Sequence, residues 1–333
     1  MSPDALRFER IYVERDAADH PEAKRIVSLF TEASIVLVDY YGEVFHRRRQ
    51  SFQLEKRNPA LILAVARGQL LYEATSRIAE RSSTPTYYTD QLRNCPFNCD
   101  YCFLQGMHQS GYPLVFVNSE DYLKTAHERS LEGPCHLTVS FLTDALAFEP
   151  LIPSVATWVA FANDHPSMTI EVRTKSRYAS LLPLPPINGN VLVTWTLSPE
   201  EVTKRYERGA ATLEQRLAAL EYAAKKGWRV GIAIDPVLLV REWRSAYQQL
   251  LSRLETLELD VIESVSYGVF RMNHSFLETM QAERGDTPIL HHPFTREGSL
   301  RTYTSAEIDA IRSLMEPKLI RLFGPERVAF IHG

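Results

Sequence analysis

Long apolar runs and cysteines are both scarce in this chain of 333 residues. No stretch is long and apolar enough to cross a bilayer, and the first residues after Met1 contain no apolar run typical of a secretion signal. The four cysteines do not form the framework of pairs found in disulfide-rich secreted proteins. We therefore expect a soluble protein of the reducing cytoplasm, without a membrane partner.

The chain also lacks an excess of charge of one sign. Lys and Arg total 37 against 41 for Asp and Glu, which gives a formal net charge of -4. This balance excludes a global attraction to nucleic acid, so any affinity for DNA requires a local basic surface. The segment His46–Arg49, close to Tyr40 and Tyr41, is one candidate, because it could bind phosphates beside an aromatic ring. A solvated charged loop explains the same residues.

Three of the four cysteines are concentrated in one short segment. Cys95, Cys99 and Cys102 have the spacing C-x3-C-x2-C, and Cys135 lies far downstream. This spacing lets one loop place three thiolates on a single inorganic cluster. Zinc sites and cubane clusters generally have four protein ligands, so a cubane bound here would keep one iron open for a small ligand. The alternative is a set of core or zinc-binding cysteines.

Strand and helix patterns alternate after this loop. Strands are predicted at residues 136–141, 168–174, 191–197, 229–235 and 261–267, and capping boxes at Thr212 and Thr304 mark helix starts. Alternation of this kind implies a parallel sheet. We expect an α/β fold with an incomplete TIM-like (β/α)6 barrel, whose ligand site lies at the carboxyl ends of the strands.

The predicted barrel is flanked by two smaller regions. Residues 1–80 are interpreted as an N-terminal α/β subdomain with strands at 10–14 and 34–39 and a helix at 22–33. Residues 77–85 are predicted to link it to the barrel. The barrel itself occupies residues 81–275, with the cluster loop at 94–106, and residues 276–333 form a C-terminal extension with a helix that ends near Leu322 and closes the barrel.

The segment from Asn94 to Gly106 resembles the cluster loop of radical S-adenosylmethionine (SAM) enzymes. Its C-x-Y-C-x-L-Q ending is similar to the spore photoproduct lyase family in particular, and further resemblances lie at residues 11–14, 214–216, 235–237, 242–247 and 268–271. The resemblance implies a radical SAM barrel, with a 4Fe-4S cluster on Cys95, Cys99 and Cys102 and with SAM bound at the open iron. It also implies reductive cleavage of SAM to a 5′-deoxyadenosyl radical that abstracts hydrogen from the substrate.

The same resemblance implies SAM contacts where the strands end. The matching residues are Thr143, Asp144, Lys175, Thr196 and Asp235. Each has an ordinary structural alternative as well, since Asp144 could cap a turn, Lys175 could be a solvated charge and Thr196 could be a β-branched strand residue.

Two positions depart from the family pattern. The lyases have a hydrogen-donating cysteine shortly before the segment at Thr143, where this chain has Phe141 or Leu142, and they have a tyrosine on each side of the third cluster cysteine. Here Tyr101 is kept as a candidate catalytic residue, and Phe103 replaces the second tyrosine. Cys135 is the spare thiol, which could serve as the donor if its strand turns it inward and is otherwise a structural cysteine.

We therefore expect a lyase-like radical SAM enzyme, and the substrate class that we favour is a damaged pyrimidine in DNA. Its expected partners are SAM, damaged DNA at His46–Arg49, and an electron donor such as flavodoxin or ferredoxin. A non-nucleic substrate is the first alternative, because of the missing hydrogen donor and the negative net charge. A non-catalytic iron-sulfur protein that senses redox state or binds nucleic acid is the second.

Overall fold

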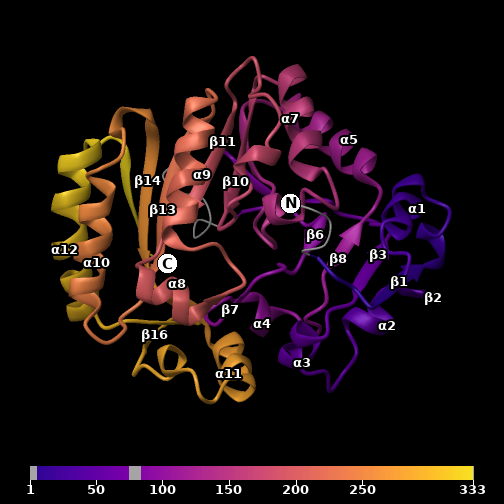
Figure 1. The fold of residues 1–333 in the computed structure, drawn as a ribbon, viewed down its shortest axis with the longest axis horizontal. Helices are drawn as coiled ribbons and strands as arrows, with labels where there is room; N and C mark the ends of the chain where they lie inside the picture. Colours follow the sequence, from indigo (N-terminus) through magenta and orange to yellow (C-terminus); the bar gives the residue numbers. More distant parts are fainter. Residues whose placement is uncertain (1–5, 75–83, 333) are drawn as a thin grey trace.

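The computed structural model describes residues 6–74 and 84–332 and is built around two sheets (Figure 1). Within these residues the larger sheet has eight strands in the order β18-β14-β13-β11-β10-β9-β5-β4. Neighbouring strands from β5 to β18 pair in parallel, and β4 pairs antiparallel with β5 at the edge. The strands are β4 Leu71–Glu73, β5 Thr86–Thr89, β9 Cys135–Thr138, β10 Met168–Thr174, β11 Val191–Thr196, β13 Arg229–Val237, β14 Ile262–Val269 and β18 Val328–Ile331.

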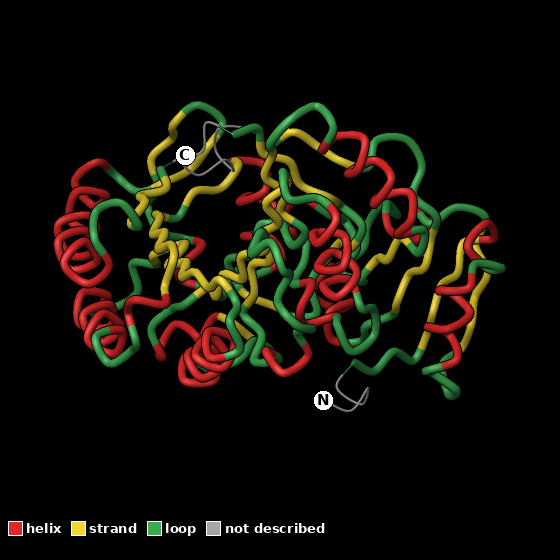
Figure 2. The backbone as a smooth tube through the Cα atoms, turned by 90° about the horizontal axis from the view of Figure 1, so that it is seen from above, coloured by secondary structure: helices red, strands yellow, loops and turns green. Residues whose placement is uncertain are grey.

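The larger sheet curves into an open barrel. Figure 2 shows its strands along an arc, with helices on the outer side. The middle strands are nearly continuous apolar runs, as expected for parallel strands covered on both faces. The covering helices are α5 Ser119–Ser130, α7 Ser154–Asp164, α9 Leu213–Lys225, α10 Trp243–Leu254 and α12 Ser305–Phe323. The predicted incomplete barrel is confirmed.

Capping boxes fix the starts of two of these helices. The Thr212 side chain accepts from the backbone of Gln215 before α9, and Thr304 accepts from Glu307 before α12, each with the reciprocal bond present. Each box satisfies two backbone donors that would otherwise lack partners in the first turn. Both predicted helix starts are confirmed.

The smaller sheet holds the segment that precedes the barrel. Its strand order is β2-β1-β3-β8-β6, with α1 Pro21–Ser28, α2 Gly42–Phe45 and α3 Phe52–Arg57 beside it. The strands are β1 Arg10–Glu14, β2 Ser34–Val38, β3 Leu61–Ala64, β6 Leu92–Arg93 and β8 Leu114–Phe116. Since β6 and β8 lie beyond residue 80, this sheet also includes chain from the predicted barrel region. The predicted link at 77–85 falls mostly outside the described residues, and the division into domains stays a prediction.

Three strands of the larger sheet, β4, β5 and β18, were missing from the sequence prediction. The strand β5 consists of Thr-Tyr-Tyr-Thr and lacks the apolar alternation that marks a half-buried strand, while β18 is a four-residue strand after a long helix. Short elements complete the structure: β7 Asn98–Cys99, β12 Glu207–Arg208, β15 Arg271–Asn273, β16 Thr295–Glu297, β17 Leu300–Thr302, α4 Leu104–Met107, α6 Ala145–Phe148, α8 Glu200–Tyr206 and α11 His274–Glu283. In the described part of the chain, no helix combines the length and the apolar character needed to cross a membrane.

Candidate functional site

The cysteine loop begins and ends in the smaller sheet. It leaves β6 and returns through β8, and these two strands pair with each other in antiparallel register. Asn94 at the start of the loop has a φ of 63°, and its side-chain amide donates to the carbonyls of Ser110 and Tyr112, both at 2.8 Å. Within the loop, β7 pairs with β12, which joins Cys99 to Glu207 on the barrel side. The loop is therefore joined to the smaller sheet at both ends and, through the separate β7–β12 pair, to the segment between α8 and α9.

Polar side chains from distant segments hold the middle of the loop. Arg284, just after α11, is buried and donates to Asp100 at 2.8 Å and to Gln105 at 2.5 Å. Gln105 in turn donates to the Cys99 carbonyl at 2.7 Å. From the other side, the Lys56 ammonium of α3 donates to the Cys95 carbonyl. Burial lowers the pKa of Lys56, and the three nearby cysteines oppose that shift.

The three cysteines of the loop face cations. Cys99 is buried and the other two are half-buried. Burial raises the pKa of Cys99 to about 12, and Lys175 acts against this shift. Among residues 6–74 and 84–332, no three His, Cys, Asp or Glu side chains are arranged to hold one metal ion. A cubane cluster does not require such an arrangement, because each thiolate binds a different iron, and three thiols close to Lys56, Lys175 and Arg284 suit an anionic cluster.

The carboxyl end of β9 leads to the loop. The Thr143 hydroxyl donates to the carbonyl of Asn94 at 2.8 Å, directly before Cys95. Asp144 is buried and caps α6, accepting from the Ala147 amide at 3.0 Å, the Thr174 hydroxyl at 2.8 Å and the Lys175 amide at 2.6 Å. Burial raises the pKa of Asp144, although these hydrogen bonds oppose it. The structure thus brings Thr143, Asp144 and Lys175 together beside the loop.

A buried polar cluster lies next to Lys175. We call Tyr101, Lys175, Glu207 and Arg216 the polar wall. Both the Tyr101 hydroxyl and the Arg216 guanidinium donate to Glu207, and the Lys175 ammonium lies 5.4 Å from the centre of the Tyr101 ring. Burial would lower the pKa of Lys175, but Cys99 and Glu207 hold it above its ordinary value.

Glu207 and its salt bridge were not predicted from the sequence. Arg216 lies in one of the segments that resemble the family, and it forms this salt bridge with both side chains fully buried. Burial would raise the pKa of Glu207, but Arg216 and Lys175 hold it below its usual range. Glu207 stands in an ordinary polar segment, and only its pairing with the cysteine loop reveals its position.

Thr196 and Asp235 complete the edge formed by the strand ends. Thr196 is buried, and its carbonyl accepts from Arg216 at 3.0 Å. Asp235 receives two hydrogen bonds from Arg271, at 2.8 and 2.9 Å. Gly268 leaves room for this pair, because a Cβ there would lie 2.6 Å from an Asp235 carboxylate oxygen. The Asp235 carboxylate is therefore engaged within the protein.

Comparison with known proteins agrees with this geometry. Residues 6–282 match the family model described as spore photoproduct lyase. This chain belongs to the spore photoproduct lyase family. Its curated relatives include spore photoproduct lyases from Bacillus subtilis (strain 168), 22% identical over 77% of this chain and 76% of the relative, and from Clostridium acetobutylicum, 23% identical over 74% and 73%.

Solved structures confirm the fold. A spore photoproduct lyase complexed with dinucleoside spore photoproduct superposes with a TM-score of 0.81 at 17% identity, covering 98% of this chain and 99% of that one. A mutant with bound AdoMet and dinucleoside spore photoproduct gives 0.78 at 18% identity, with the same coverage. Membership of the family confirms the predicted class of radical SAM enzyme and its cofactors, SAM and a 4Fe-4S cluster.

The two departures from the spore photoproduct lyase pattern lie side by side. The rings of Phe103 and Phe141 are 5.5 Å apart, Phe141 lies 4.7 Å from Tyr88, and Tyr88 stacks on Tyr72 at 5.3 Å. All four side chains are half-buried. We call them the aromatic wall. It runs from the edge strand β4 to the residue after Cys102, so a surface of aromatic rings, two of them phenols, includes both positions at which the sequence is expected to depart from the family pattern.

Cys135 is not brought to this site. It is the first residue of β9 and is level with Met168, the first residue of β10, whereas Lys175 follows the last residue of β10. At about 3.3 Å per residue, the two lie roughly 20 Å apart along the sheet. Cys135 is buried at the amino end of the strands, and burial raises the pKa of its thiol.

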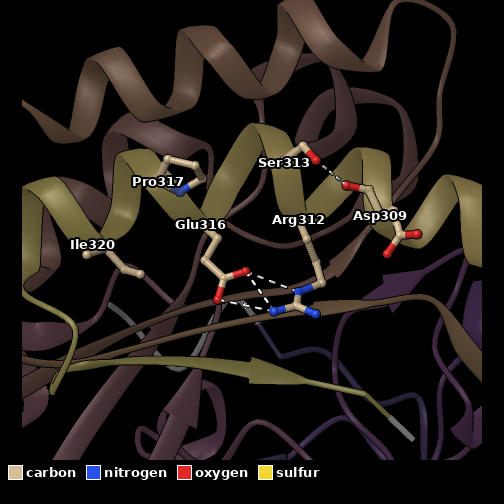
Figure 3. A pocket seen from close by; sticks show the side chains of 6 residues that line it. All are labelled: Asp309, Arg312, Ser313, Glu316, Pro317 and Ile320. Atoms are coloured by element: carbon tan, nitrogen blue, oxygen red, sulfur yellow. Dashed lines mark hydrogen bonds and ion pairs between the residues drawn. The ribbon is translucent and has the colours of Figure 1, made fainter.

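Three surface features contain none of the residues predicted to bind the cluster or SAM. His46–Arg49 is exposed, as is Tyr40, and Arg49 has a φ of 62°. A pocket of about 420 Å³ lies along α12, where Figure 3 shows the Arg312–Glu316 ion pair beside Pro317 and Ile320. A second pocket, of about 380 Å³, is lined by Trp243, His292 and Glu307 among others. Neither pocket includes a residue predicted to bind the cluster or SAM.

Proposed function

We propose that this protein binds a 4Fe-4S cluster through Cys95, Cys99 and Cys102, cleaves SAM, and acts on a damaged pyrimidine in DNA. The observation that carries the proposal is the meeting of the cysteine loop with the carboxyl ends of adjacent barrel strands. Thr143 bonds to the residue before Cys95, and Lys175 lies between Tyr101 and Glu207, close to Cys99. Ligand sites of barrels lie at these strand ends.

When bound, the cluster and SAM supply one-electron cleavage of the sulfonium bond and a 5′-deoxyadenosyl radical that abstracts hydrogen. The chain supplies the charges that orient SAM. A carboxylate can accept about four hydrogen bonds, and Asp144 accepts three from the protein, which leaves capacity for the ammonium of SAM. Lys175 carries the positive charge that suits its carboxylate.

The remaining predicted residues support this arrangement in different ways. Thr196 offers a hydroxyl beside Arg216, at a place suited to the ribose. Asp235 holds Arg271 and so positions the next strand end rather than contacting SAM. Tyr101 is held by Glu207 and keeps its hydroxyl proton inside the polar wall. In Cys135 we see a structural thiol, because it lies at the opposite end of β9.

Two surfaces support a nucleic-acid substrate. The aromatic wall presents rings on which an unstacked base can lie, and such stacking contributes about 1–3 kcal/mol per base. The exposed His46–Arg49 segment can bind phosphates. The solved relatives contain a dinucleoside spore photoproduct, which is a damaged pyrimidine pair. A flavodoxin or ferredoxin as electron donor stays a prediction.

A non-nucleic substrate is the second candidate, and the observation that favours it is the presence of phenylalanine at both Phe103 and Phe141. A phenyl C–H bond is a poor hydrogen donor, so Phe141 and Phe103 cannot return hydrogen as a thiol and a phenol would. An enzyme that forms a product without such a return would tolerate both replacements.

The deciding experiment is anaerobic reconstitution with iron and sulfide, reduction by dithionite with SAM, and chromatography for 5′-deoxyadenosine. We expect it to form, and we expect DNA that contains pyrimidine lesions to be converted in the same assay. An intact cluster that yields no 5′-deoxyadenosine would instead favour a sensing or binding protein. Formation of 5′-deoxyadenosine with no DNA conversion would favour the non-nucleic substrate.

Lys175→Ala tests the assignment of SAM contacts. It should retain the cluster while weakening SAM binding about tenfold or more, because a charge-assisted hydrogen bond contributes about 1.5–3 kcal/mol. Lys204→Ala is the matched control, since Lys204 is exposed and forms its ion pair with Glu200 on its own helix. Equal SAM affinity in the two variants would contradict the assignment.

A further inference from the structure

Lys56 is a cation without a counter-ion next to the cysteine loop. It lies in the last turn of α3, is half-buried, and donates to the Cys95 carbonyl. Across the described ranges 6–74 and 84–332, no carboxylate forms an ion pair with it. The charged groups that act on its ammonium are the three cysteines of the loop and Arg284.

Two arginines of the site differ from Lys56 in this respect. Arg284 is paired with Asp100 at 2.8 Å, and Arg216 is paired with Glu207. Removing a charge from water is costly unless an opposite charge compensates it. Lys56 therefore lacks the compensation that these two arginines have, and the groups it faces are the three loop cysteines, which become thiolates when they bind iron.

The position of Lys56 is fixed by its neighbours on α3. Gln53 donates to Gln105 at 2.7 Å and accepts from Asn98 at 3.1 Å, so it bonds to the loop at two points. The Glu55 carboxylate accepts from the Ser110 hydroxyl at 2.6 Å and the Gly111 amide at 2.8 Å. A Cβ at Gly111 would lie 2.5 Å from the Phe52 carbonyl oxygen, which shows how closely the helix and the loop approach.

We propose that Lys56 is a positioning residue that raises the reduction potential of the cluster held by Cys95, Cys99 and Cys102. This inference rests on the proposed function, because it requires the cluster. Net charge and hydrogen bonding near a cluster set its potential, and a fixed positive charge stabilises the form with one more electron. Lys56 thus makes the one-electron reduction that precedes SAM cleavage easier.

The test compares three variants of the reconstituted full-length protein: Lys56→Gln, Lys56→Arg and Arg57→Gln. Arg57 is the next residue along the chain and is exposed. Its variant therefore removes one positive charge that does not contact the cysteine loop through the Lys56 hydrogen bond. Iron and sulfide content is measured first, and the midpoint potential is then obtained by a redox titration followed by electron paramagnetic resonance.

We expect Lys56→Gln to shift the midpoint to a more negative potential, and Lys56→Arg and Arg57→Gln to stay at the wild-type value. An unchanged midpoint in Lys56→Gln, or an equal shift in Lys56→Arg, would overturn the inference and leave the proposed function standing. Loss of the cluster in Lys56→Gln alone would support a need for the charge, whereas loss in both Lys56 variants would reduce Lys56 to a structural contact. A wild-type protein that takes up no 4Fe-4S cluster would overturn the inference and the proposed function together.

Discussion

The two neighbours of Cys102 point into opposite kinds of surroundings. Tyr101 belongs to the polar wall, where a buried carboxylate satisfies a phenol and a guanidinium. Phe103 belongs to the aromatic wall, where half-buried rings contact one another and the Tyr72 hydroxyl donates to Asp90 at 3.3 Å. The polar wall depends on specific partners, since removing any one leaves a buried charge or donor unpaired. The aromatic wall depends on shape, so it can change its residues more freely, and this is where the chain departs from its family.

The largest effect should come from the loop that separates the two walls. Cys99→Ala removes one of the three thiolates, and we expect the reconstituted protein to lose its cluster and all SAM cleavage. Cys135→Ala is the control, because that thiol lies at the far end of β9, and it should retain the cluster. Iron and sulfide content together with the visible absorbance measures both. A full cluster in Cys99→Ala would contradict the ligand assignment.

Substitutions in the polar wall should lower the unfolding free energy more than substitutions in the aromatic wall. Glu207→Gln leaves Arg216 as an unpaired buried charge, and breaking a buried pair in this way costs about 3–5 kcal/mol of unfolding free energy. Glu214→Gln breaks an exposed pair with Arg253 and should cost less than about 1 kcal/mol. Urea unfolding of both variants measures the difference. Equal losses of unfolding free energy would contradict the expected difference between a buried and an exposed ion pair.

Truncation of the aromatic wall should cost less. Phe→Ala in a full core costs about 3–5 kcal/mol, and since Phe141 is half-buried we expect about 1–3 kcal/mol for Phe141→Ala. Phe141→Leu keeps most of the apolar volume and serves as the control, with a loss of about 1 kcal/mol. The same urea unfolding experiment ranks them. A loss for Phe141→Ala that exceeds that of Glu207→Gln would reverse the proposed order of the walls.

Lowering the pH should weaken the contribution of a charged contact to stability and leave that of an aromatic contact unchanged. Burial would raise the pKa of Asp235, but Arg271 holds it below 3.8, its ordinary value. A lowered carboxyl pKa stabilises the folded state above the ordinary value, and this contribution is lost as the pH falls through the folded pKa. The difference in unfolding free energy between wild type and Asp235→Asn should therefore be largest above about pH 4 and should shrink below it. The corresponding difference for Phe141→Ala should not change over this range, because no charge is removed.

Periodic and local patterns made much of this structure predictable. Alternating strands and helices implied the barrel, and the carboxyl ends of parallel strands converge, so Thr143, Asp144 and Lys175 could be placed together before any coordinates existed. The spacing of Cys95, Cys99 and Cys102 identified the loop in the same way. Their roles as ligands remain predictions until the variants above are measured.

Contacts between distant segments were not predictable in this way. Arg284 donates to Asp100 although 184 residues separate them in the sequence, and Tyr101 meets Glu207 where β12 pairs with β7. Strand β5 is short and polar, and β6 and β8 join a sheet whose other strands precede them by tens of residues. Lys56 stands in a polar helix, and nothing in the sequence nearby indicates that its ammonium donates to the Cys95 carbonyl. Such pairings depend on the folded topology, which no local window of sequence contains.

The pairing of β6 with β8 has a consequence for how a cofactor is acquired. Leu92 is opposite Val115 and Arg93 opposite Leu114, so both ends of the cysteine segment are already joined when the protein has folded. Closing a flexible segment costs conformational entropy, and here that entropy is already lost when the sheet folds, before iron binds. Assembly of the cluster then has to fix only the residues between β6 and β8, whose ends are already held together. This favours uptake of the cluster by the folded protein over uptake by the nascent chain.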